Sequence, residues 1–208
     1  MNRNADEVRA GYEVIAETYH ARRVAREQVN VEWLDGLRPL LPPNGVVVDL
    51  GCGSGVPISR YFASRGYRVT GYDFSPAMID LARREVPEAV FNVAAIESLS
   101  LEPESVDIVT SFFAIIHIDR TLHGEIFKRI FSWLKPGGAC FLSLGAEDNP
   151  DEYQAEWHGA PMRWTHFGAE TNLALLREAG FDLPWHEDED LGSERHLFVI
   201  GSKPTSPG

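Results

Sequence analysis

The stretch "VVVDLGCGSG", residues 46–55, constrains the fold of this chain more than any other. Three valines and Asp49 lead into a turn with glycines at positions 51, 53 and 55. A continuously apolar strand is typical of a parallel sheet that is buried on both faces. The glycines predict a strand-to-helix turn where the backbone passes close to a ligand, at the carboxyl end of a strand.

The rest of the chain alternates predicted strands with predicted helices. Expected strands span 46–50, 67–73, 89–94, 106–113, 139–145, 181–187 and 195–203. Expected helices span 4–22, 25–38, the glycine turn to about 65, 75–86, 121–134 and 169–180, and a long loop is expected over 145–168. The alternation predicts a parallel sheet covered by helices on both faces. The last two strands are too close in sequence for a crossover helix, so they should form an antiparallel hairpin. We therefore predict a Rossmann-like three-layer α/β sandwich with a seven-stranded, mostly parallel sheet and an antiparallel C-terminal edge hairpin.

Length and charge limit the partners of this chain. The 208 residues suit one domain with a full hydrophobic core, and the net charge is −12. Such acidity disfavours nucleic acids and anionic membranes, and we expect Arg22, Arg23 and Arg26 to form a solvated helix face. Neither a signal peptide nor a membrane helix is predicted. Cys52 and Cys140 do not suggest a disulfide framework, so we expect a cytoplasmic protein, as a monomer or a homodimer.

The glycine turn does not fit two common phosphate-binding patterns. The dinucleotide pattern G-x-G-x-x-G fails at its third glycine, which falls on Val56 or on Ile58 depending on the start. The phosphate-loop pattern needs a lysine beside the glycines, and the first lysine is Lys128. An acid, Asp49, instead precedes the first glycine, which favours a cationic or hydroxylated ligand over a phosphate.

A second acid indicates a ribose. Asp73 ends a predicted strand 22 residues after Gly51, where a carboxylate can bind both hydroxyls of a ribose. Asp73 could instead cap the helix that follows. Ser75, directly before Pro76, already fits that capping role, so we predict that Asp73 binds ribose.

Five stretches, in this order and spacing, resemble class I S-adenosylmethionine-dependent methyltransferases of the small, single-domain type. They are "VVVDLGCGSG", "VTGYDFSPAMIDLAR", "VDIVTSFFAIIHI", "IFSWLKPGG" and "LLREAGF", and they cover most of residues 46–181. The N-terminal "GYEVIAETYHARR" resembles the lid helix that closes over the methionine end of the cofactor in this family. The resemblance implies one domain over 1–208, with lid helices in 1–40, a cofactor-binding core in 45–201 and a disordered tail in 202–208.

The resemblance also implies roles for the residues that match the motifs. Asp49 faces the ammonium of the cofactor, Asp73 holds the ribose hydroxyls, and Phe74 and Met78 flank the adenine. The remaining implied contacts to the methionine and ribose portions come from Gly51, Cys52, Gly53, Gly55, Ser111 and Phe112. On the lid, Tyr12 and Tyr19 are candidates to reach the carboxylate or to shield the sulfonium, with helix packing as the alternative for each.

One position departs from the family pattern. Members often carry an aspartate after the third strand, which accepts a hydrogen bond from the adenine amino group, and here the position is Ala95. Ile96 can still supply a backbone contact, and Glu97 could replace the carboxylate. We expect somewhat weaker cofactor binding, since one hydrogen bond contributes about 1–2 kcal/mol.

Methyl transfer from a sulfonium is an in-line displacement in which the protein aligns the acceptor and excludes water. A hydroxyl acceptor gains from a general base, and His117 and His166 are the candidates. The alternative for His117 is to hydrogen-bond the loop around Asp119. Large side chains in the expected loop are candidate acceptor contacts, which suggests an apolar or aromatic small molecule. These are Trp157, His158, Met162, Trp164 and Phe167.

Two alternatives stay open at this point: a nicotinamide-dependent oxidoreductase on a similar sheet, and a non-catalytic protein that binds S-adenosylmethionine or S-adenosylhomocysteine. No metal is expected, because Asp148, Asp151 and Glu152 lack a recognisable ligand spacing.

Overall fold

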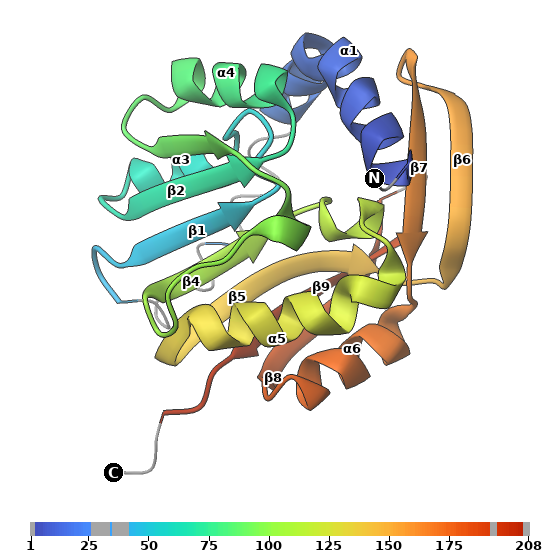
Figure 1. Cartoon of the computed structure of the whole chain (residues 1–208). Coiled ribbons are helices and arrows are strands. Elements are labelled where there is room, and N and C mark those ends of the chain that lie inside the picture. Colours follow the sequence, from blue (N-terminus) through green and yellow to red (C-terminus); the bar gives the residue numbers. More distant parts are fainter. Residues whose placement is uncertain (1–2, 26–33, 35–41, 192–194, 206–208) are drawn as a thin grey trace.

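A seven-stranded sheet forms the centre of the computed structural model (Figure 1). Its strand order is β3-β2-β1-β4-β5-β9-β8. The structure describes residues 3–25, 34, 42–191 and 195–205. The strands are β1 (Val46–Leu50), β2 (Arg68–Asp73), β3 (Val90–Val93), β4 (Val106–Ser111), β5 (Leu134–Gly145), β8 (Asp182–Asp190) and β9 (Arg195–Ser202). Strands β1 to β5 pair in parallel, and β9 runs antiparallel to both β5 and β8. The predicted fold class, including the C-terminal edge hairpin, is confirmed.

Helices cover both faces of this sheet. They are α3 (Ile58–Ala63), α4 (Pro76–Glu85), α5 (His123–Trp133) and α6 (Ala169–Glu178), with short 3₁₀ turns η2 (Ile96–Ser98), η3 (Ile115–His117) and η4 (Arg120–Leu122). In β1, Val47 packs into the cluster with α3, whereas Val48 packs into the cluster with α5 and α6. This alternation is what a strand buried on both faces requires. Ser75 caps α4 as predicted, because its side chain accepts a hydrogen bond from the Met78 amide.

A second, two-stranded sheet replaces the long loop expected over 145–168. Strands β6 (Asn149–Trp157) and β7 (Ala160–His166) form an antiparallel hairpin. The hairpin turns at His158 (φ 55°) and Gly159 (φ 98°), two positive φ values in succession that suit a tight hairpin loop. The loop prediction is wrong because β6 is largely exposed and lacks a clear apolar alternation.

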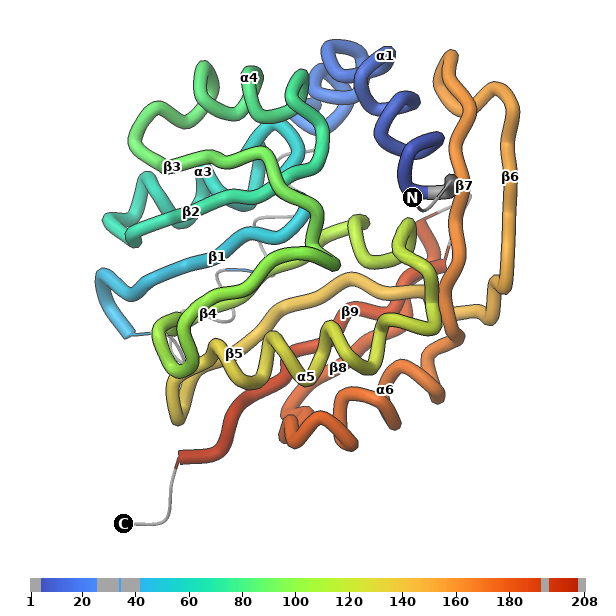
Figure 2. The backbone as a smooth tube through the Cα atoms, in the orientation of Figure 1, coloured from blue at the N-terminus to red at the C-terminus, as the bar shows by residue number. Residues whose placement is uncertain are grey.

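Helix α1 (Arg3–Ala25) lies beside β7 and above the carboxyl ends of the central strands (Figures 1 and 2). Val8, Tyr12 and Ile15 pack in one cluster with Met162 and Trp164 of β7. The predicted helix over 25–38 falls almost entirely outside the described residues. Two residues of the expected disordered tail are ordered, since β9 includes Ser202 and the Lys203 amide donates to the Gly138 carbonyl at 2.8 Å. No described helix combines the length and the apolarity needed to span a membrane.

Candidate active site

The turn that follows β1 contains three glycines, Gly51, Gly53 and Gly55, whose backbones have left-handed conformations. Their φ values are +66° at Gly51, +53° at Gly53 and +76° at Gly55. A Cβ at position 51 would lie 2.1 Å from the Ala114 Cβ, whereas one at position 53 would meet no atom within 4 Å. Gly53 therefore lies beside open space, and both positions favour glycine by backbone conformation.

A cleft opens beside this turn, between α1 and the carboxyl ends of β1, β2, β3 and β4. About 640 Å³ of space not filled by protein atoms lies in this cleft, including the solvent space at its open mouth. The predicted cofactor residues that line it are Tyr12, Tyr19, Gly51, Gly53, Asp73, Phe74, Met78, Ala95, Ile96, Glu97 and Phe112. Residues far apart in sequence therefore meet in one place.

Asp73 is a buried carboxylate that lines this cleft. Its two carboxylate oxygens accept hydrogen bonds from the Gly53 and Ser75 amides, each at 2.9 Å. Burial raises its pKa from the usual 3.8 to about 6, although these amide donors oppose the shift. A carboxylate has about four lone-pair sites in total, so Asp73 can also accept a hydrogen bond from a ligand.

A narrower extension of the cleft runs past Tyr19, Gly51 and Phe112 toward Arg23 and Asp49. Asp49 accepts hydrogen bonds from the hydroxyls of Ser59 at 2.7 Å and Thr110 at 2.8 Å. Burial raises its pKa to about 6, with the nearby Arg23 charge among the influences that lower it.

The structure changes our interpretation of Arg23, which we expected on a solvated helix face. Its guanidinium lies 5.0 Å from the centroid of the Phe113 ring, and the residue lines the narrow extension. The helical spacing of Tyr12, Tyr19 and Arg23 is the sequence signal that could have found it, because all three fall on one face of α1.

His117, on η3, lines the wide part of the cleft. Its Nδ1 lies 2.7 Å from the Arg163 carbonyl oxygen, and its Nε2 lies 3.0 Å from the Tyr12 hydroxyl. These partners are on α1 and β7, not in the loop around Asp119, which we had considered as the alternative.

Comparison with known proteins gives a consistent result. Residues 47–138 match the family described as "Methyltransferase domain". This region is therefore similar to a methyltransferase domain. The chain is 34% identical over 134 residues to malonyl-[acyl-carrier protein] O-methyltransferase of Enterobacter lignolyticus, covering 64% of this chain and 50% of that protein. It thus spans about half the length of the first curated relatives that it matches.

Solved structures share the fold of this chain. A S-adenosylmethionine-dependent methyltransferase from Methanosarcina mazei superposes with a TM-score of 0.70 at 23% identity, covering 82% of this chain and 97% of that one. The DhpI complex with SAH superposes with a TM-score of 0.72 at 18% identity, covering 97% of each chain. The resemblance read from the motifs is confirmed over residues 47–138.

Several predicted contacts lie outside the cleft. His166 lies against Gly145 and hydrogen-bonds the Glu147 carbonyl at 3.0 Å, in a separate polar cavity. Met162 and Trp164 are buried between β7 and α1, because the expected loop is a strand with its apolar side against that helix. Trp157 packs against the rings of Tyr12 and Tyr19, and Phe167 packs edge-on against His123.

Two further predicted residues support the turn rather than line the cleft. The Ser111 hydroxyl donates to the Leu50 carbonyl at 3.0 Å, and its side chain is fully buried. Gly55 faces Phe91 and Val86, each within 3.1 Å of a Cβ placed there. Cys52 lines the narrow extension, where burial and two nearby aspartates raise the pKa of its thiol.

Proposed function

We propose that this chain is a S-adenosylmethionine-dependent methyltransferase that acts on a small molecule. The observation that carries the proposal is Asp73, a buried carboxylate held by two amides beside Gly53, in a cleft with apolar walls. Two acids, Asp73 and Glu97, and neither lysine nor arginine occur among the described residues that line the wide part. That lining suits an uncharged ribose and adenine better than a pyrophosphate.

The donor set fits the whole cofactor. Asp73 would hold the ribose hydroxyls, Phe74 and Met78 would flank the adenine, and Asp49 would face the ammonium of the methionine portion. Arg23 would hold its carboxylate, since it lines the same extension as Asp49. When bound, the cofactor supplies an activated methyl group on a sulfonium, and the protein's part is to align an acceptor and exclude water. Ala95 leaves the adenine amino group without the usual aspartate.

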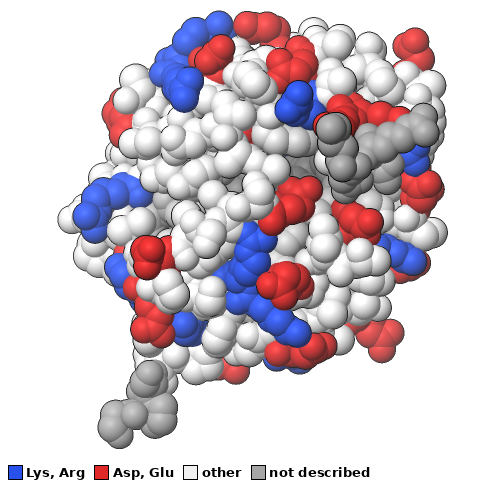
Figure 3. Space-filling view, viewed as in Figure 1, with Lys and Arg blue, Asp and Glu red and all other residues white. Residues whose placement is uncertain are grey.

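The acceptor is proposed to be a small apolar or aromatic molecule with an oxygen nucleophile. The walls support this, because Tyr12, Phe74, Phe112 and Phe113 bring aromatic rings to the cleft. The Enterobacter relative is named an O-methyltransferase. Among the described residues on the face shown in Figure 3, acidic side chains lie beside the basic ones. His117 is the candidate general base, since it lines the cleft and His166 does not.

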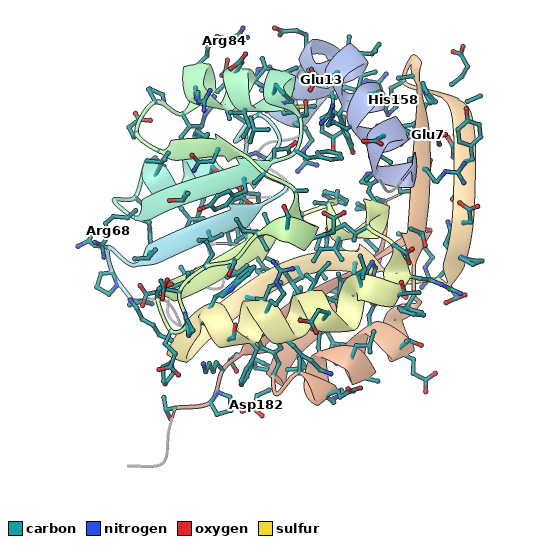
Figure 4. The ribbon with its side chains drawn as sticks, in the orientation of Figure 1. Glu7, Glu13, Arg68, Arg84, His158 and Asp182 are labelled. Carbon is teal, nitrogen blue, oxygen red and sulfur yellow. The ribbon has the colours of Figure 1, made fainter. Side chains whose placement is uncertain are left out.

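Calorimetric titration tests the proposal with S-adenosylhomocysteine and NADH. We expect S-adenosylhomocysteine to bind and NADH not to bind, and selective binding of NADH would refute the proposal. Asp73→Asn should weaken S-adenosylhomocysteine binding about 10- to 100-fold, since a hydrogen bond to a charged group contributes about 1.5–3 kcal/mol. The matched control is Asp182→Asn at the exposed start of β8, at the opposite side of the molecule (Figure 4). Binding without methyl transfer to any acceptor would instead indicate a non-catalytic binding protein.

A further inference from the structure

Tyr12 and His117 form a hydrogen-bonded pair with a defined direction. The Arg163 carbonyl oxygen, 2.7 Å from Nδ1 of His117, can only accept, so Nδ1 carries the ring hydrogen of the neutral imidazole. The Nε2 atom of His117 then carries no hydrogen and accepts a hydrogen bond from the Tyr12 hydroxyl at 3.0 Å. Tyr12 therefore donates its hydrogen bond to a neutral histidine, whose Nε2 atom can accept a proton.

The pair lies in the proposed reaction cleft and is held firmly there. Both side chains line the same cavity as Gly51 and Asp73. Tyr12 is 9% exposed, and its ring packs edge-on against neighbouring rings, with centroids 5.4 Å from Tyr19 and 6.1 Å from Trp157. Such packing fixes the hydroxyl in one place.

Arg163 ties together the two elements that carry the pair. Its carbonyl orients His117, while its guanidinium binds Glu7 of α1, with 3.3 Å between Nε and Oε2. Glu7 lies five residues before Tyr12 and faces β7 (Figure 4). Asp151 of β6 also binds the guanidinium. Arg163 is thus a positioning residue for both Tyr12 and His117.

We propose that Tyr12 is a catalytic residue that relays a proton from a hydroxyl acceptor to His117. This inference rests on the proposed methyl transfer. The acceptor oxygen forms a bond to the methyl carbon as the carbon–sulfur bond breaks, and that electron pair stays on sulfur. The acceptor proton passes to the Tyr12 oxygen, the Tyr12 proton passes to Nε2 of His117, and the imidazolium later releases a proton to water.

The relay also defines the class of acceptor. A tyrosine hydroxyl has a reference pKa of about 10, so it exchanges protons readily with a phenol or an enol of similar acidity. An aliphatic alcohol is a far weaker acid, and an amine or thiolate has a lone pair that needs little base assistance. A phenolic or enolic hydroxyl on a flat apolar molecule therefore fits both the relay and the aromatic walls.

Nitrogen NMR of the full chain, labelled with ¹⁵N-histidine, tests the pair without any ligand or turnover. We expect the neutral His117 ring to carry its hydrogen on Nδ1. In Tyr12→Phe, the tautomer should stay, while the Nε2 signal moves toward that of a ring nitrogen without a hydrogen bond. His117→Gln assigns the signals, and Tyr67→Phe on the α3 side of the sheet is the matched control. A hydrogen on Nε2, or an Nε2 signal unchanged in Tyr12→Phe, overturns the proposal.

Methylation of phenol, aniline and thiophenol, followed as S-adenosylhomocysteine release, tests the relay itself. We expect phenol to be methylated, and Tyr12→Phe and His117→Gln to lower kcat about 100-fold or more, as loss of general acid–base catalysis does. The KM for phenol should change little in Tyr12→Phe, and Tyr67→Phe should behave as the wild type. Methylation of aniline or thiophenol but not phenol, or full kcat in Tyr12→Phe, overturns the relay. A wild-type protein that fails to bind S-adenosylhomocysteine refutes the proposed function instead, whatever the NMR result.

Discussion

A substitution of Arg23 can test the contacts to the amino-acid portion of the cofactor separately from those to the rest of the cofactor. Arg23 lines the narrow extension with Asp49, where the amino-acid portion of the cofactor is proposed to lie. Arg23→Gln should weaken S-adenosylhomocysteine binding about 10- to 100-fold, since a hydrogen bond to a charged group contributes about 1.5–3 kcal/mol. Binding of 5′-methylthioadenosine, which lacks that portion, should not change.

Calorimetry with both ligands measures this difference. Arg22→Gln is the matched control, because Arg22 is an exposed neighbour on the same helix and contacts His158 rather than the cleft. Equal weakening of both ligands in Arg23→Gln would mean that Arg23 supports the cleft as a whole and does not bind the carboxylate.

Asp73 makes cofactor binding dependent on pH. Its pKa is about 6 in the free protein because burial outweighs the two amide hydrogen bonds, and nearby Glu13 raises it further. Ribose hydroxyls donate to the ionised carboxylate, so S-adenosylhomocysteine should bind less well below pH 6, by up to about tenfold per pH unit. Titration at pH 5 and pH 7 checks this, with proton release expected on binding near pH 6. A constant affinity for S-adenosylhomocysteine over this pH range would contradict a direct contact to Asp73. In Asp73→Asn, the part of the pH dependence of the affinity that comes from Asp73 should disappear.

At the scale of elements, the β6–β7 hairpin supports the cleft from behind. Met162 is fully buried on β7 and packs in the α1 cluster, but it does not line the cleft. Met162→Ala should therefore lower the free energy of unfolding by about 2–5 kcal/mol. Urea denaturation measures the change, and Tyr153→Ala, at a half-exposed residue of β6, should cost much less. Equal losses in the two variants would mean that β7 is not a core strand.

The hairpin and the cleft differ in how far the sequence could predict them. The glycine turn, Asp73 and the Ser75 cap depend on residues close in sequence, so local spacing was enough. The hydrogen bond between Tyr12 and His117 joins residues 105 positions apart. The Arg163 carbonyl that orients His117 is a backbone atom, which no residue pattern identifies. His166 was misplaced because its segment was expected to be a loop over the cleft, whereas β7 directs it to another cavity.

For the whole molecule, two buried aspartates at the cleft oppose folding of the free protein at neutral pH. Burial is the main cause that raises the pKa of both Asp49 and Asp73 to about 6. A group whose pKa is higher in the folded state than in the unfolded state favours folding at low pH, and that contribution disappears as the pH rises through the folded value. The window here runs from about pH 4 to pH 6.

Comparison of Asp73→Asn with the wild type isolates this effect from the other acids of the chain. An amide at position 73 does not ionise, so the variant should gain relative stability as the pH rises from 4 to 7. The rise in the pKa of Asp73 from 3.8 to about 6 corresponds to a change of about 3 kcal/mol in the free energy of unfolding, at 1.36 kcal/mol per pKa unit. Urea denaturation of both proteins at pH 4, 5, 6 and 7 measures the difference, with Asp182→Asn as the exposed control. If the difference in the free energy of unfolding between the two proteins did not change with pH, burial would not raise the pKa of Asp73 in the free protein. Hydrogen bonds from a ribose would then offset no burial penalty at Asp73.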